Sequence, residues 1–285
     1  GIRLAGGTIP GSGSCTVTVN VTVPAAGAYT NTLAAGTITT TNAGSVSAAT
    51  SATLNAFAPP TLAKSFVPAS IASGGTSALR LTLSNPAANP APLTTVSVSD
   101  PLGTFNLAVA APATVSFTPA ACGTVQSRAA VGAGGFGALT AGHLEIQFSV
   151  ASLAAGASCR ADINVTSSTV GARNNVTAAP VATGPVALTG TAASATLTVL
   201  GAPTFAKAFA APKNIAVGGA TTLTFTLTNG NAQALTGAAF IDDFPSGVSL
   251  ANATVGGSCA VGAVQSRATT GATPFGALTA GHISL

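Results

Sequence analysis

The chain has 285 residues, of which 47% are hydrophobic but only 5% aromatic and 5% charged, and its formal net charge is +4. Disordered chains are usually richer in charge and poorer in Val, Ile, Leu and Phe, so this composition indicates a folded protein long enough for about two domains. Scattered arginines without interleaved aromatic residues argue against nucleic acid binding, and no apolar run approaches the ~20 residues of a transmembrane helix.

Short segments that alternate apolar and small polar residues run through the chain, separated by Pro, Gly and Asn turns. Such alternation is typical of half-buried β-strands. In chain order we expect strands at residues 15–23, 61–67, 78–84, 94–100, 143–150, 194–200 and 204–210. No segment shows sustained helical spacing with caps, so the pattern predicts an all-β sandwich with Greek-key connections.

The sequence repeats itself with a period of roughly 143 residues. Residues 59–85 align with 202–229, residues 125–143 return as 264–282, and residues 11–21 match 155–165. We therefore expect the back part of one repeat at 1–56, a complete repeat at 57–200 and the front part of a third at 201–285. Prolines in "FAPP" at 57–60 and "LGAP" at 200–203 predict short, stiff joints between the repeats.

The chain begins and ends at nearly the same phase of the repeat, because residues 1–4 and 282–285 share an apolar pattern. From this we expect that the segment belongs to a longer array, or that neighbouring copies complete its two ends.

No arrangement of residues indicates an enzyme, a cofactor or a metal ion. "GAGGFG" at 132–137 is not followed by a helix that could receive a phosphate. The five acidic residues are too scattered for a calcium cage, and no two cysteines stand at zinc-ligand spacing. His143 and His282 occupy the same "LTAGH" stretch of two repeats, which indicates a repeated turn residue rather than a metal ligand.

A family resemblance follows from the order of several motifs. "TLAKSFVPASIASGGTSALRLTLSN", then "VSVSDP", the Cys-to-"VNV" strand and "GAYTNTL" resemble the bacterial Ig-like conserved repeat domain, the type numbered eleven among domains of unknown function. The resemblance covers the complete repeat and both partial ones. It implies tandem Ig-like sandwiches in a large secreted or surface-attached bacterial protein, without catalysis.

We therefore expect an extracellular or cell-surface structural protein, a segment of a filament, stalk or sheath whose partners are neighbouring copies or repeats of itself. The alternative is an adhesin-type module that binds a glycan or a surface protein. An exposed aromatic cluster would favour the adhesin, and the single tyrosine gives it little support.

The four cysteines fall at two phases of the repeat, with Cys122 and Cys259 early and Cys15 and Cys159 late. The complete repeat holds one of each, so we expect a Cys122–Cys159 disulfide and hence an oxidising compartment. By the same reasoning, Cys259 and Cys15 would bond to cysteines of adjacent copies. Four small buried thiols are the alternative.

One lysine is expected on the side of its strand that faces the core. Alternation aligns Lys64 with its apolar neighbours and places Asp100 on the inward side of a second strand. In a third strand the repeat phase selects Asn175, although the adjacent Asn174 leaves the register of that strand open. This trio resembles the one that forms Lys–Asn isopeptide bonds in pilin and adhesin domains, which implies a bond from Lys64 to Asn175 assisted by Asp100. A plain Lys–Asp ion pair and a lysine that reaches solvent at an edge strand are the alternatives.

The following partial repeat has the same pattern. Lys207 takes the place of Lys64, and Asp242 rather than Asp243 is expected to point inward. Asn31, in the first partial repeat, stands at the phase of Asn175, so an equivalent of Asn31 from another copy would complete the second trio.

Overall fold

The computed structural model describes residues 1–211, 213–259, 264–271 and 274–284. The chain divides into two compact units, Gly1–Leu200 and Gly201–Leu285. The predicted all-β fold is confirmed, since the only helix among the described residues is the single 3-10 turn η1 (Leu102–Phe105). None of the described residues belongs to a helix with the length and hydropathy of a membrane span.

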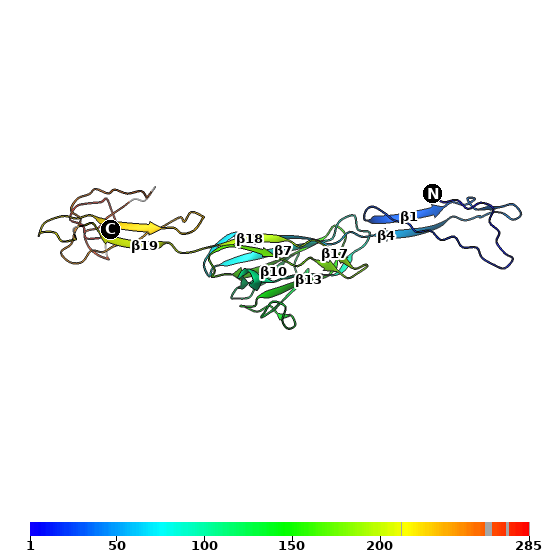
Figure 1. Ribbon diagram of the computed structural model, residues 1–285, viewed down its shortest axis with the longest axis horizontal. Coiled ribbons are helices and arrows are strands. Elements are labelled where there is room, and N and C mark those ends of the chain that lie inside the picture. Colours follow the sequence, from blue (N-terminus) through cyan, green and yellow to red (C-terminus); the bar gives the residue numbers. More distant parts are fainter. Residues whose placement is uncertain (212, 260–263, 272–273, 285) are drawn as a thin grey trace. The chain divides into compact units, whose positions relative to one another are not determined.

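Residues 57–200 form a β-sandwich, drawn in cyan to yellow-green in Figure 1. One large sheet has five strands, which are β10 (Val115–Thr118), β14 (Ser158–Thr166), β7 (Thr76–Ser84) and β5 (Thr61–Val67) in that order, with β9 (Ala108–Val109) also paired to β14. The second large sheet runs β12 (Gly137–Ala138), β11 (Thr124–Arg128), β13 (Glu145–Leu153), β8 (Leu93–Asp100), β16 (Val181–Ala182) and β17 (Leu188–Thr189). A third sheet has the order β15 (Gly171–Val176), β18 (Ser194–Leu200) and β6 (Ser70–Ala72).

The inward faces of the two large sheets share one hydrophobic core. Successive residues of a strand point to opposite faces, so each strand of alternating sequence contributes every second side chain. The first sheet buries Leu79, Leu81 and Leu83 of β7 and Ala161, Ile163 and Val165 of β14, and the second buries Val96, Val98, Ile146, Phe148 and Val150. Each fully buried Leu, Ile, Val or Phe contributes roughly 1.5–3 kcal/mol relative to an exposed one.

The pairing of β7 with β14 is the longest in the sandwich, from Ser84 opposite Ser158 to Thr76 opposite Thr166. The other edge of β7 pairs with β5. β7 is therefore paired along its whole length by β14, a strand from the back of the repeat, and along Ala78–Ser84 by β5, a strand from its front.

Residues 1–56 form two hairpin-like pairs. β1 (Gly27–Leu33) pairs with β4 (Thr50–Ala56), and the short β2 (Thr39–Thr40) pairs with β3 (Gly44–Ser45). In the repeat alignment β1 and β4 correspond to β15 and β18.

The strand predicted at residues 15–23 is wrong, because these residues are all described and none belongs to a strand. The matching residues of the complete repeat form β14. That strand is held by hydrogen bonds to β7 and β10, and residues 1–56 contain no counterpart of either strand.

The second unit has β19 (Thr204–Phe209) paired with β20 (Leu223–Thr228), the counterparts of β5 and β7. Among the described residues β20 pairs with β19 alone, so its other edge is open. In the complete repeat the same edge of β7 carries β14. The second unit thus reproduces the front of the sandwich without the strand that closes it.

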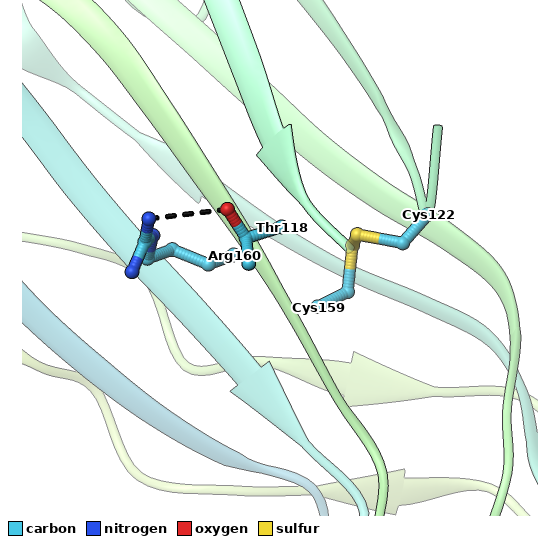
Figure 2. Close-up of a disulfide and its surroundings, with 4 residues drawn as sticks. All are labelled: Thr118, Cys122, Cys159 and Arg160. Atoms are coloured by element: carbon cyan, nitrogen blue, oxygen red, sulfur yellow. Dashed lines mark hydrogen bonds between the residues drawn. A yellow bond between two sulfur atoms is a disulfide. The ribbon is translucent and has the colours of Figure 1, made fainter. Parts of the chain in front are cut away.

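A disulfide joins Cys122 and Cys159, whose Cα atoms are 5.7 Å apart (Figure 2). Cys122 lies in the loop that carries the chain from β10 in one sheet to β11 in the other, and Cys159 lies on β14. The next residue, Gly123, must be small, because a Cβ there would lie 2.7 Å from the Phe148 ring and from the Ser149 carbonyl oxygen. The disulfide therefore links the loop that crosses between the two large sheets to β14, which pairs with β7 in the first of them.

Removing this bond should destabilise the sandwich. Closing a loop with a sequence separation of 37 residues restricts the unfolded chain by about 4 kcal/mol in the chain-entropy account. We expect the double variant Cys122→Ala/Cys159→Ala to lose about that much free energy of unfolding, measured by urea unfolding followed with far-UV circular dichroism. Cys15→Ala, which removes an exposed free thiol, is the control; equal midpoints for all three proteins would contradict the expectation.

Candidate functional site: a buried Lys-Asp-Asn cluster

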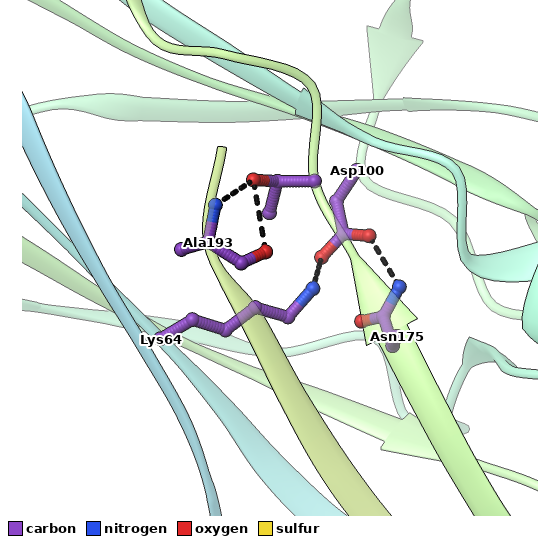
Figure 3. A network of polar contacts seen from close by, with 5 residues as sticks. Lys64, Asp100, Asn175 and Ala193 are labelled. Carbon is purple, nitrogen blue, oxygen red and sulfur yellow. Dashed lines mark hydrogen bonds and ion pairs between the residues drawn. The ribbon is translucent and has the colours of Figure 1, made fainter. Parts of the chain in front are cut away.

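Three polar side chains from three different sheets meet inside the complete repeat (Figure 3). Lys64 lies in β5, Asp100 is the last residue of β8, and Asn175 lies in β15. Lys64 stands between Leu62 and Phe66 in the alternation of β5, and these two residues pack on or in the core, so the lysine shares their face. The strand pattern that builds the core therefore also delivers the amine into it.

The three side chains are bonded through the carboxylate. Lys64 Nζ donates to Asp100 Oδ2 at 2.6 Å, and Asn175 Nδ2 donates to Asp100 Oδ1 at 2.6 Å. The side chains of Lys64 and Asp100 are 0% exposed, and Asn175 is likewise wholly buried. The alternative of a lysine that reaches solvent at an edge strand therefore does not hold.

The cluster holds a buried charged amine and an unpaired buried oxygen, and both are unfavourable. Burial lowers the pKa of Lys64, because the charged ammonium loses its water, and the nearby Asp100 opposes this only in part. The carboxamide oxygen Oδ1 of Asn175 is buried and has no hydrogen-bond partner among the described residues. A buried acceptor left unpaired costs about 1–3 kcal/mol, so the arrangement leaves one polar atom unsatisfied.

A neighbouring contact holds the asparagine strand in place. The Thr177 hydroxyl accepts a hydrogen bond from the Ala193 N–H at 3.0 Å and donates to the Ala193 carbonyl at 3.3 Å (Figure 3). Thr177 follows Asn175 by two residues, and this contact continues the pairing of β15 with β18. It thereby positions Asn175 beside Asp100.

The second unit contains the corresponding ion pair without the amide. Lys207 Nζ lies 2.6 and 2.8 Å from the two carboxylate oxygens of Asp242, but the Lys207 side chain is 39% exposed. Asp243 bonds instead to Arg267, at 3.1 Å. No carboxamide among the described residues hydrogen-bonds to Asp242, and Asn31 lies exposed on β1 of the other unit.

A second repeated polar pair was missed by the sequence reasoning. Ser127 Oγ lies 2.8 Å from His143 Nδ1, and Ser266 Oγ lies 2.7 Å from His282 Nδ1. The Ser127 hydroxyl is buried and also accepts the Thr140 N–H, so it closes a turn.

The signal for this pair was the identical Ser-to-His spacing in 125–143 and 264–282, although residues 272–273 of the second segment lie outside the described ones. Within the described ranges no three His, Cys, Asp or Glu side chains are grouped to hold a metal ion.

The two ion pairs predict different responses to loss of the carboxylate. Asp100→Ala leaves a wholly buried lysine without its partner and should cost about 3–5 kcal/mol of unfolding free energy. Asp242→Ala, the matched variant, breaks a partly exposed pair and should cost no more than about 1 kcal/mol. Urea unfolding of both variants tests this, and equal losses would show that burial does not set the importance of Asp100.

Comparison with known proteins places the chain in one family. Curated proteins give no significant match. A family model described as a domain of unknown function, DUF7933, matches residues 1–56, 60–199 and 203–284. Only the short stretches between these three segments and the last residue of the chain lie outside the match. The chain therefore belongs to the DUF7933 family of domains of unknown function.

Proposed function

We propose that the protein is a non-catalytic structural segment of an extracellular bacterial filament, stalk or sheath, in which successive β-sandwich repeats complete one another. One observation carries the proposal. In the complete repeat, the part that corresponds to residues 1–56 and the part that corresponds to residues 201–285 bury apolar side chains against each other. In the two partial repeats, the matching apolar side chains are exposed. The resemblance of the sequence motifs to the bacterial Ig-like conserved repeat domain supports the same role.

The back partial repeat exposes an apolar strand sequence. Val17, Val19 and Val21 are 54%, 48% and 74% exposed, respectively. They correspond to Ala161, Ile163 and Val165 of β14, which are all 0% exposed. Residues 15–23 thus have the sequence of a central strand and lack the sheet that would hold it.

The front partial repeat exposes the matching surface. Phe205 and Phe240 are 52% and 42% exposed, and their rings lie 5.0 Å apart, with Phe225 of β20 4.8 Å from Phe240. Exposed aromatic rings are also the feature expected of an adhesin, but Phe225 corresponds to Leu81, a wholly buried residue of β7, which favours burial of this surface against another copy. The open edge of β20 lies beside this apolar surface, where the complete repeat has β14.

A second copy supplies the missing strand. By analogy with β7 and β14, residues 15–23 of one copy would pair antiparallel with β20 of another, with Cys15 opposite Leu227 as Cys159 is opposite Leu83. Adding a strand to an open edge satisfies backbone hydrogen bonds and buries alternate side chains, as in β-augmentation. In a longer chain the next repeat would serve as this second copy.

Two further features fit an extracellular array. The Cys122–Cys159 disulfide favours an oxidising compartment. Cys15 and Cys259 are free and exposed, and they stand at the phases of Cys159 and Cys122. The completed sandwich would therefore bring them together across two copies.

Association should depend on the face of residues 15–23. We expect the wild-type chain to form head-to-tail oligomers as its concentration rises, and Val19→Asp to weaken association by about 100-fold or more because it places a charge in the new core. Val170→Asp, a change at a similarly exposed valine outside this face (47%), is the control. Sedimentation velocity measures the oligomers; monomers at every concentration, or equal association of both variants, would contradict the proposal.

Oxidation should then link the copies through specific cysteines. We expect a ladder of disulfide-linked oligomers on non-reducing electrophoresis, with a Cys15–Cys259 peptide on digestion, because completion places these thiols as Cys159 and Cys122 are placed. Cys15→Ser and Cys259→Ser should each remove the ladder but leave the sedimentation of the reduced protein unchanged. Mainly Cys15–Cys15 or Cys259–Cys259 links would speak against head-to-tail completion.

A further inference from the structure

We infer that Lys64 and Asn175 are joined by an intramolecular amide bond, which forms in the folded complete repeat with Asp100 as the proton carrier. This covalent modification goes beyond the structural role proposed above and does not depend on assembly between copies. Its three groups belong to β5, β8 and β15, so the bond would fasten two sheets that share no hydrogen-bonded strand.

The reactive groups are already held together. The amine and the carboxamide bind the two oxygens of a single carboxylate, each at 2.6 Å, and all three side chains are shielded from water (Figure 3). The effective molarities of well-oriented intramolecular reactions reach about 10⁵–10⁸ M, and here one carboxylate holds both reacting groups.

An ion pair between Lys64 and Asp100 alone does not explain why the Asn175 carboxamide is buried beside them. Asn175 uses its N–H group on Asp100 and leaves Oδ1 buried and unsatisfied. The amide product resolves this, because a neutral Asp100 carboxyl can donate to the new carbonyl oxygen while the new amide N–H donates to its other oxygen. The reaction also removes two buried charges, whose desolvation is costly.

The chemistry balances without another reactant. The Lys64 ammonium passes a proton to Asp100, and the neutral amine attacks Cγ of Asn175. The bond from Cγ to Nδ2 breaks as Asp100 delivers its proton to Nδ2, which leaves as ammonia, and the attacking nitrogen returns one proton to Asp100. The products are a secondary amide, a protonated Asp100 and ammonia, in place of the ion pair and the primary amide.

The burial of Lys64 supports the first step. An amine must be unprotonated to act as a nucleophile. Loss of water around the ammonium lowers the pKa of Lys64, even though Asp100 opposes the shift, so the neutral form is easier to reach than for an exposed lysine.

The second unit is an internal contrast. Lys207 has its carboxylate but no carboxamide among the described residues, and its side chain is partly exposed. In the monomeric chain we therefore expect Lys64 to be linked and Lys207 to remain a free amine.

Intact mass spectrometry and peptide mapping of the full-length chain test the inference. We expect a mass lower than the sequence mass by one ammonia, in addition to the hydrogens lost in the disulfide. Trypsin, which cuts after Lys and Arg, should not cut at Lys64 and should leave residues 4–80 joined to residues 174–207. Cyclisation at an Asn-Gly pair such as Asn229-Gly230 also releases ammonia, so the branched peptide is the decisive product.

Variants assign the bond to its residues. Lys64→Arg, Asn175→Ala and Asp100→Ala should each abolish the branched peptide, whereas Asn174→Ala, at the exposed neighbour of Asn175, and Lys207→Arg should retain it. If a variant fails to fold by circular dichroism, the wild-type map alone decides. A wild-type map with separate peptides ending at Lys64 and spanning 174–207 overturns the inference.

Discussion

The pairing of β7 with β14 is the interaction on which the rest of the sandwich depends. β7 comes from the front of the repeat and β14 from its back, so their hydrogen bonds close the repeat across more than seventy residues of sequence. The pair carries six core side chains on one face, and it presents Cys159 to the disulfide. Among the described strands, β5, which carries Lys64, pairs with β7 alone.

Two further contacts hold the complete repeat together at separate places. The disulfide joins β14 to the loop between the sheets, and the Lys64–Asp100–Asn175 cluster joins β5 to β8 and β15. A buried ion pair is a weak source of stability, because burying two charges costs much of what their attraction returns. In this chain, where only 5% of the residues are charged, such a pair therefore calls for another explanation. A covalent bond at the same place would resist separation of the sheets whatever the solvent, which fits the structural role proposed above.

Much of this architecture is readable from alternation and repetition. The strands expected at 61–67 and 194–200 coincide with β5 and β18, and the face of each strand follows from which residues are apolar. Alternation does not say whether a partner strand is present, which is why residues 15–23 were wrongly expected to be a strand. The Ser127–His143 contact was also missed, since it depends on a turn folding back on β11 and not on any period within a strand.

We propose that the two partial repeats are the front and the back of one sandwich, each incomplete by itself. Amide hydrogen exchange of the full-length chain at low and high protein concentration tests it most directly, because exchange reports which backbone groups are hydrogen-bonded. We expect β7 and β14 to be protected at both concentrations, whereas residues 15–23 and β20 should gain protection together as concentration rises. Protection of residues 15–23 that is the same at both concentrations, or oligomers that form while these residues still exchange freely, would contradict it.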